Sequence, residues 1–348
     1  MKKIFITGVA GFIGSNLAKK LLEDKNIFVI GSDNMNDYYD VDLKKYRLNK
    51  LTKYNNFTFF NCNLANKESL NNIFNTFLPD VVVNLAAQAG ARDSIINPDN
   101  YIESNIIGFY NILEECKKYP VKHLVYASSS SVYGDNTKVP FSTDDKVDSP
   151  VSIYAATKKS NEVFAHAYSK LYDIPSTGLR FFTVYGPAGR PDMAYFKFTE
   201  KLVNNEKIQI YNYGNCRRDF TYIDDIVEGI IRVIEKPPEK KIGNDGLPIA
   251  PYKIYNIGNS HPESLNDFVT ILIEELKNAG VLDNNFDLAS HIELLPMQPG
   301  DVEVTYADTT ELEKDFGYKP NTTLREGLKS FTQWYKDYYI DKKKINIK

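Results

Sequence analysis

Two residues that can act as a proton-transfer pair stand four positions apart in this sequence. Tyr154 and Lys158 lie in Ser-Ile-Tyr-Ala-Ala-Thr-Lys-Lys, and on a helix this spacing places both on one face. A free tyrosine titrates near pKa 10, so it needs a positive charge beside it to act as a base at neutral pH. One unit charge at about 4 Å supplies about 4 kcal/mol at an effective dielectric near 20. We predict that Lys158 lowers the pKa of Tyr154 inside a partly closed cleft.

A serine cluster favours this interpretation over a chance pair, which the 24 tyrosines of the chain would also allow. Residues 127–131 read Ala-Ser-Ser-Ser-Ser and follow a predicted strand. In a doubly wound sheet, ligands bind beyond the carboxyl ends of the strands. We therefore predict a catalytic set of Ser129, Tyr154 and Lys158, with Ser128 and Ser130 beside the substrate.

A glycine-rich turn indicates what the pair works with. Gly8-x-x-Gly11-x-x-Gly14 follows a predicted strand and opens a predicted helix, where free backbone N–H groups can hold a pyrophosphate. Asp33, at the end of the second predicted strand, can accept hydrogen bonds from an adenosine ribose. No Arg or Lys follows Asp33 directly, so NAD is preferred over NADP. The alternative is a turn in which the glycines serve structure alone.

The elements that must position these residues alternate as in βαβ units, which predicts an α/β protein with a doubly wound parallel sheet, a Rossmann fold. We expect strands at 3–7, 28–32, 57–61, 81–85, 124–127 and 176–181, and helices at 14–23, 100–118, 153–172, 264–277 and 324–338. After Arg180 loops dominate, and 236–251 is expected to be a surface loop. We predict an NAD-binding domain of residues 1–180 and 219–258, a smaller α+β substrate-binding domain of 181–218 and 259–340, and a charged tail, 341–348.

Composition excludes several classes of function. With 43% apolar residues, 25% charged residues and a net charge of −3, the chain has no electrostatic footprint for nucleic acid or an anionic membrane. The three cysteines are far apart and predict neither disulfides nor a zinc site, so we expect no metal. No apolar run approaches the length of a membrane span, and we expect a cytoplasmic protein.

The chain resembles the extended short-chain dehydrogenase/reductase superfamily, in particular the NAD-dependent epimerase/dehydratase family. Besides the glycine turn and Tyr154-x-x-x-Lys158, the likeness rests on Asn84-Leu85-Ala86-Ala87, Ser104-Asn105, Val132-Tyr133-Gly134, Arg218-Asp219-Phe220, Tyr222-Ile223-Asp224-Asp225 and Pro299-Gly300-Asp301. The resemblance implies that NAD is bound by Gly8, Gly11, Phe12, Ile13, Gly14, Asp33, Asn34, Asn63, Leu64, Leu85, Ala86, Ala87, Gln88, Asn105, Tyr154 and Lys158.

The serines at the end of the predicted strand indicate which reaction of this family the chain carries out. Dehydratases and decarboxylases that resemble this chain carry an acid before the Val-Tyr-Gly, where this chain has Ser129, Ser130 and Ser131. Without that second proton-transfer group, oxidation and re-reduction by an epimerase are favoured. Residues 33–40, 180–187 and 189–193 are similar to the UDP-glucuronate 4-epimerases. That resemblance implies that Thr183 and Arg190 lie near a sugar carboxylate, that Arg218 binds the diphosphate and that Asp301 holds the uridine ribose.

Three positions depart from the pattern of these epimerases and keep two alternatives open. Ala188 and Asp93 stand where many relatives have tryptophan and tyrosine, and Asn63 replaces a common aspartate. An extra acid near the cleft would disfavour a carboxylated sugar, so a 4-epimerase of neutral UDP-hexoses is one alternative. A catalytically silent NAD-binding regulator is the other. Resemblance also implies a homodimer formed through helices 100–118 and 153–172, and a product used in a capsule or cell-envelope polysaccharide.

Overall fold

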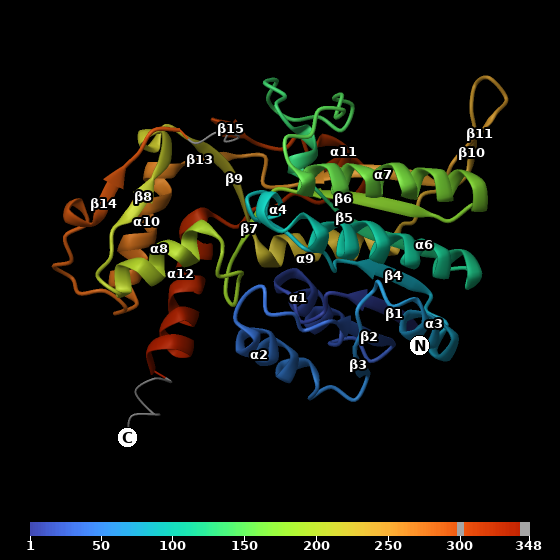
Figure 1. Ribbon diagram of the computed structural model, residues 1–348, viewed down its shortest axis with the longest axis horizontal. Coiled ribbons are helices and arrows are strands. Elements are labelled where there is room, and N and C mark those ends of the chain that lie inside the picture. Colours follow the sequence, from blue (N-terminus) through green and yellow to red (C-terminus); the bar gives the residue numbers. More distant parts are fainter. Residues whose placement is uncertain (298–302, 342–348) are drawn as a thin grey trace.

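A seven-stranded parallel sheet forms the centre of the larger of two lobes in the computed structural model, which describes residues 1–297 and 303–341 (Figure 1). The strands run in the order β12-β6-β5-β4-β1-β2-β3. Their bounds are β1 Lys2–Thr7, β2 Ile27–Asp33, β3 Phe57–Asn61, β4 Val81–Asn84, β5 His123–Ser129, β6 Ser176–Phe181 and β12 Tyr252–Ile257. The order reverses between β1 and β4, where Thr7 pairs with Asn84, and this confirms the predicted doubly wound fold.

The central strands could be predicted because both faces of the sheet are buried, so that these strands are continuous apolar runs in the sequence. Val81, Val82 and Val83 are each 1% exposed or less, because helices cover both sides of the sheet. The seventh strand, β12, was not predicted from the sequence. Its residues, Tyr-Lys-Ile-Tyr-Asn-Ile, mix polar and apolar types, and its first half is only half-buried at the edge of the sheet.

The helices of the larger lobe lie in two layers. On one face α1 (Phe12–Leu21) packs against α9 (Ile223–Glu235) and α2 (Val41–Leu51). On the other face α6 (Gly108–Lys118) packs against α3 (Lys67–Phe77) and α7 (Ile153–Tyr172). The predicted helix 100–118 is one continuous rod that begins at α5 (Pro98–Tyr101) and passes through a π-helical turn, η1 (Ile102–Ile107), into α6.

The smaller lobe is built from later segments of the chain. Its mixed sheet contains β7 (Thr183–Tyr185), β9 (Arg217–Tyr222), β13 (Pro262–Ser264) and β15 (Val304–Thr305), and β8 (Ile208–Ile210) pairs with β14 (Ile292–Leu294). Three helices, α8 (Ala194–Val203), α10 (Leu265–Asn278) and α12 (Leu324–Tyr335), close an aromatic-rich core over these strands. The chain crosses back to the larger lobe through α9 and β12, after β9 has paired within the smaller sheet.

The remaining elements lie at the periphery. The segment expected to be a surface loop contains a projecting hairpin of β10 (Lys241–Ile242) and β11 (Pro248–Ile249). Short helices occur at α4 (Asp93–Ile96) and α11 (Thr310–Phe316), with 3-10 turns at η2 (Ser130–Tyr133), η3 (Tyr211–Gly214) and η4 (Ala289–His291) and a π-helical end, η5 (Lys336–Asp341). Within the described ranges, every helix is too short or too polar to span a bilayer.

Candidate active site

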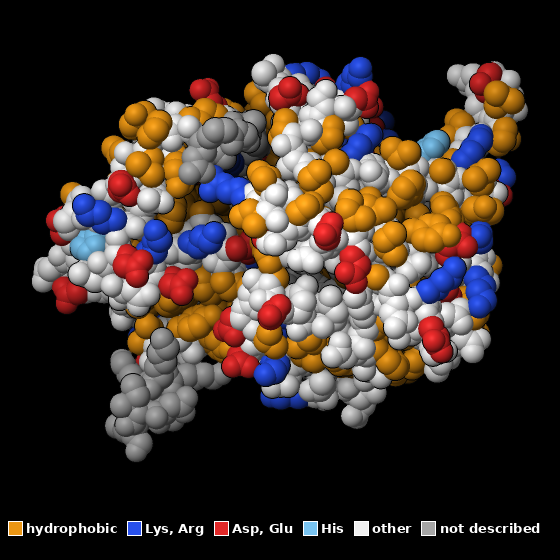
Figure 2. All heavy atoms as spheres, in the orientation of Figure 1, with side chains coloured by type: hydrophobic (Ala, Val, Ile, Leu, Met, Phe, Trp, Pro, Cys, Tyr) orange, Lys and Arg blue, Asp and Glu red, His pale blue; other side chains and the backbone are white. Residues whose placement is uncertain are grey.

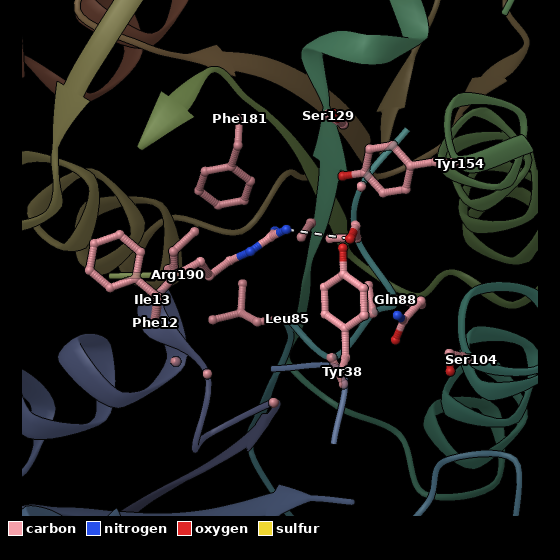
Figure 3. A pocket seen from close by; sticks show the side chains of 18 of the residues that line it. Phe12, Ile13, Tyr38, Leu85, Gln88, Ser104, Ser129, Tyr154, Phe181 and Arg190 are labelled. Carbon is pink, nitrogen blue, oxygen red and sulfur yellow. Dashed lines mark hydrogen bonds between the residues drawn. The ribbon is translucent and has the colours of Figure 1, made fainter. Parts of the chain in front are cut away.

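One pocket lies at the carboxyl ends of the central strands and gathers most of the residues predicted from the sequence (Figure 3). It extends from the glycine turn, past the end of β5 and the start of α7, to the loop after β7. The predicted residues that line it are Gly8, Gly11, Phe12, Ile13, Gly14, Asp33, Asn34, Asn63, Leu64, Leu85, Ala86, Ala87, Gln88, Ser128, Ser129, Ser130, Tyr154, Lys158, Thr183 and Arg190.

The glycine turn has no room for side chains. Gly8 adopts a φ of +68°, and a Cβ there would lie 2.8 Å from the backbone nitrogen of Ala86. A Cβ on Gly14 would overlap the carbonyl oxygen of Gly8. The first helix can therefore pack closely on the turn and present its free N–H groups to an anion.

The far side of the turn fits an adenosine ribose. The Asp33 carboxylate is fixed by two backbone donors, since Oδ2 accepts from Ala10 N at 3.1 Å and Oδ1 from Met35 N at 2.9 Å. The buried Ser32 hydroxyl lines the same pocket and has no hydrogen-bond partner among the described residues. A buried polar atom without a partner is costly, so a ligand hydroxyl there would satisfy it. These residues fit a dinucleotide.

The pair Tyr154 and Lys158 comes from the first turns of α7, as the spacing predicted. Ser152 begins this helix by accepting a hydrogen bond from Ala155 N, at 3.1 Å. Lys158 is buried, and its Nζ donates to the carbonyl of Ala127 at 3.0 Å. The ring of Tyr101 packs edge-on against Tyr154, with 6.1 Å between ring centroids, and Figure 3 shows the Tyr154 hydroxyl pointing into the pocket.

Burial dominates the electrostatics of the pair, and the predicted lowering of the Tyr154 pKa by Lys158 stays a prediction. Burial raises the pKa of Tyr154, and the opposing contributions come from a hydrogen bond with Ser129 and from the positive charge of Arg190. Burial also lowers the pKa of Lys158, to about 8, because the ammonium has lost its water. The spacing correctly predicted that Lys158 shares a helix face with Tyr154. It did not account for the free energy that is needed to bury both side chains.

Arg190 enters the pocket already paired with an acid. Its Nε and Nη2 donate to the Asp192 carboxylate at 3.0 Å and 2.5 Å, and Nη2 also donates to Ala89 O at 3.3 Å. Nη1 has no acceptor among the described residues. Figure 3 shows Arg190 extending across the pocket toward Tyr38 and Tyr154. The guanidinium can therefore offer Nη1 to a ligand, but its charge is largely compensated by Asp192.

Ser128 lines the pocket with its hydroxyl already engaged. Its Oγ donates to Glu162 Oε1 at 2.7 Å, and Glu162 forms a buried ion pair with Arg180 at 2.8 Å. Ser129, Ser130 and Ser131 also line the pocket, and Ser129 Oγ accepts from Ser131 N at 3.2 Å. The Ser128 hydroxyl proton therefore joins β5 to α7, and a contact between its oxygen and substrate stays a prediction.

Two predicted ligands, Asn105 and Arg218, are not among the described residues that line the pocket. Asn105 lies behind its wall, where its side chain exchanges two hydrogen bonds with the backbone of Gln88, at 2.8 Å and 3.0 Å, and its neighbour Ser104 lines the pocket instead. Arg218 donates to the carbonyls of Arg217 and Glu303, and its described contacts include no ion pair with Asp219 or Asp224. Asp301 falls outside the described residues.

Asp93, the acid expected to disfavour a carboxylated sugar, is turned away from the pocket. Its Oδ2 accepts from the Tyr101 hydroxyl at 3.0 Å and its Oδ1 from Asn97 Nδ2 at 2.8 Å. It acts as a fixed acceptor behind Tyr101, and it is absent from the residues that line the described pocket.

Several lining residues were missed from the sequence: Asn36, Tyr38, Tyr39, Lys44, Phe181, Asp192 and Met193. Tyr38 and Tyr39 belong to the segment 33–40, whose likeness to known epimerases was the only signal that pointed to them. Lys44 is buried and donates to the Asn36 backbone oxygen at 2.7 Å and to its Oδ1 at 2.6 Å. No pattern in the sequence links residue 44 to a pocket formed by the turn after β2.

Comparison with known proteins agrees with this geometry. Residues 4–258 match the model of the NAD dependent epimerase/dehydratase family. The chain is 53% identical to protein CapI of Staphylococcus aureus, over 97% of this chain and 99% of that protein. It is 44% identical to UDP-glucuronate 4-epimerase 4 of Arabidopsis thaliana, over 98% of this chain and 77% of the plant protein.

A solved structure extends the match to the whole fold. The UDP-glucuronic acid 4-epimerase of Bacillus cereus, crystallised with UDP-glucuronic acid and NAD, superposes with a TM-score of 0.84 at 31% identity, covering 97% of this chain and all of the other. The glycine turn, the Tyr154–Lys158 pair and the two-lobed fold are thus found together with a family match over most of the chain. This chain belongs to the NAD-dependent epimerase/dehydratase family.

Proposed function

We propose that this protein is an NAD-dependent 4-epimerase of a UDP-sugar, and that it interconverts UDP-glucuronate and UDP-galacturonate. The observation that carries the proposal is the convergence of Tyr154 and Arg190 in one pocket, where the arginine charge acts on the tyrosine hydroxyl. The proposal assigns Tyr154 as the base for the sugar 4-OH and Arg190 as the donor to the sugar carboxylate, so that both act on one substrate. The similarity to enzymes named UDP-glucuronate 4-epimerase supports the same substrate.

The residues of the pocket suit a reaction that begins and ends with proton transfer at the 4-OH. NAD, held by the glycine turn and Asp33, would supply an acceptor for the C4 hydride. Tyr154 takes the 4-OH proton, and Ser129, which hydrogen-bonds Tyr154, holds the same hydroxyl. Lys158, charged below its pKa of about 8, stabilises the phenolate at neutral pH. Inversion of C4 would require the cofactor to supply the hydride again on the opposite face of the sugar, and Tyr154 would return the proton to the C4 oxygen.

The carboxylate side of the pocket addresses a specific hazard. A 4-keto glucuronate is a β-keto acid, and it loses carbon dioxide when the bond between C5 and the carboxylate lies parallel to the π orbital of the C4 carbonyl. We assign Thr183 and Arg190 to the carboxylate, because both line the pocket and Arg190 Nη1 remains available to it. A charge-assisted contact from Nη1 would fix the carboxylate in a poorly aligned orientation.

A neutral UDP-hexose is the second candidate substrate, and the Arg190–Asp192 pair favours it. The two-point contact with Asp192 compensates the guanidinium, so the pocket carries less positive charge than a free arginine would give it. Binding an uncharged sugar beside this compensated arginine costs less free energy than binding it beside an unpaired one.

Turnover on both sugar classes tests the proposal. The purified protein is incubated with UDP-glucuronate, UDP-glucose and UDP-N-acetylglucosamine in turn, and the nucleotide sugars are separated. UDP-galacturonate formed faster than any neutral epimer supports the assignment. Preference for a neutral sugar moves the function to the second candidate, and no epimer from any of them contradicts both.

We also propose a homodimer formed through α6 and α7. Figure 2 shows hydrophobic side chains gathered over these helices, which carry exposed Tyr110, Val163, Phe164 and Leu171. An apolar patch on two parallel rods can pack against its own copy around a two-fold axis. Val163→Glu should halve the mass measured by light scattering, whereas a monomeric wild type would refute the interface.

We place the enzyme in the cytoplasm, with its product directed to an envelope polysaccharide.

A further inference from the structure

One buried arginine that no role above accounts for joins the glycine turn to the loop that carries Arg190. Arg47 stands on α2, far in sequence from both, and is 2% exposed. Its Nη1 donates to the carbonyl of Ala10, inside the glycine turn, at 3.1 Å. Its Nε and Nη2 donate to Ala188 O at 2.9 Å and 2.8 Å, and Nη2 also reaches Gly189 O at 2.9 Å.

All five N–H donors of this guanidinium are used, because Nη1 also donates to the Tyr39 hydroxyl at 2.6 Å. Three of the acceptors are backbone carbonyls, so the contact fixes the main chain at Ala10, Ala188 and Gly189 whatever their side chains are. A lysine has three donors and no fork, and it cannot span this arrangement. The arrangement is specific to arginine.

The loop on the receiving side needs such support. Ala188 has a φ of +52°, in the left-handed region that costs a non-glycine residue energy. Gly189 lies so close to the Tyr195 hydroxyl that a Cβ would overlap it. Arg190 follows directly, so a small rotation of this loop would move its guanidinium away from the sugar.

The Arg47 guanidinium contacts the glycine turn without a carboxylate partner among the described residues. It has no ion-pair partner in ranges 1–297 and 303–341, although buried cations are ordinarily paired. Its acceptors are neutral carbonyls and a phenol, one of them in the turn that fits a pyrophosphate. An anion seated on the turn would therefore stabilise Arg47 and the contacts it makes.

We propose that Arg47 is a positioning residue that couples occupancy of the glycine turn to the placement of the Arg190 loop, residues 186–193. This inference rests on the proposed function, because it takes the roles of the turn and of Arg190 from it. Arg47 itself touches neither the reacting atoms nor the sugar.

Hydrogen exchange measured by mass spectrometry tests the coupling without relying on turnover. In the wild type, added NAD should slow exchange in peptides covering both the turn and the loop. In Arg47→Met, saturating NAD should still protect the turn, while the loop exchanges about tenfold faster than in the wild type and is no longer protected. Arg232→Met controls for the loss of an arginine elsewhere: Arg232, which is partly exposed and paired with Glu228, also donates to the backbone carbonyls of Phe316 and Gly317, and none of these residues lines the pocket.

Kinetics give a second readout. Arg47→Met should raise the KM for UDP-glucuronate about tenfold or more with kcat per bound NAD little changed, and Arg47→Lys should restore part of both effects. The combination with Arg190→Ala should be no worse than Arg190→Ala alone. A loop that NAD protects equally in Arg47→Met, or Arg47→Lys that is indistinguishable from wild type, would overturn the proposal. A wild type without activity on UDP-glucuronate would refute the proposed function, and the exchange measurement would still decide on Arg47.

Discussion

Replacement of the buried lysine should make the protein more stable while removing its activity. Lys158 is 3% exposed, and its pKa falls from an ordinary 10.5 to about 8. That difference makes the charged side chain about 3 kcal/mol less favourable in the folded protein than in the unfolded chain. Lys158→Met removes this cost and loses the hydrogen bond to Ala127 O, worth about 1 kcal/mol. The expected net gain at pH 7 is about 2 kcal/mol.

The stability gain of Lys158→Met over the wild type should decrease as the pH rises. Between pH 8 and 10.5 the unfolded chain retains the lysine proton and the folded wild type does not, so wild-type stability rises relative to Lys158→Met. The advantage of the variant is complete below pH 8 and disappears toward pH 10.5. Urea unfolding of NAD-depleted protein at several pH values measures it, with Lys159→Met, a partly exposed neighbour, as control. Equal stabilities at pH 7, or a difference that stays constant up to pH 9.5, would refute the reasoning.

Substitutions at Tyr154, Arg190 and Glu162 test the site and its support, and a fourth, at Asp192, is combined with that at Arg190. Tyr154→Phe should lose about 10²- to 10⁴-fold in turnover while its circular dichroism and bound NAD are unchanged, and near-normal rates would remove the tyrosine from the mechanism. Arg190→Ala should weaken UDP-glucuronate turnover about 10- to 100-fold, leave UDP affinity intact and release some UDP-4-keto-pentose; equal loss for UDP itself would make Arg190 a phosphate ligand. Adding Asp192→Asn should recover part of this loss, because it removes the uncompensated acid. Glu162→Gln should cost about 3 kcal/mol in urea unfolding, since it strands a buried guanidinium, against less than about 1 kcal/mol for Glu228→Gln in an exposed pair.

Residues whose role depends on local sequence were predictable. Gly8 and Gly14 serve a turn whose backbone leaves no space for a Cβ, and that constraint is written in the spacing of the glycines. Tyr154 and Lys158 share a helix face by their separation alone. Buried parallel strands such as β4 are continuous apolar runs, whereas β12 mixes polar residues at the edge of the sheet and was missed.

Residues whose role depends on a distant partner were not predictable. The Asp192 carboxylate meets Arg190 through a turn whose geometry the sequence does not specify. Arg47 reads as one more charged residue on an amphipathic helix, yet its partners are backbone atoms more than 30 and 140 positions away. Resemblance assigned Asn105 to the cofactor, whereas in the structure its side chain accepts a hydrogen bond from the backbone N–H of Gln88. The pKa of Lys158 likewise follows from burial, which pairwise spacing cannot supply.

Conversion of UDP-glucuronate in heavy water tests the central claim most directly. If C4 is inverted by hydride removal and return within the pocket, UDP-galacturonate must accumulate with its original hydrogen at C4. Proton NMR should then show a full C4–H signal in the product and no deuterium at that carbon by mass spectrometry. Deuterium at C4, or a failure to form UDP-galacturonate at all while the protein holds NAD, would contradict the account.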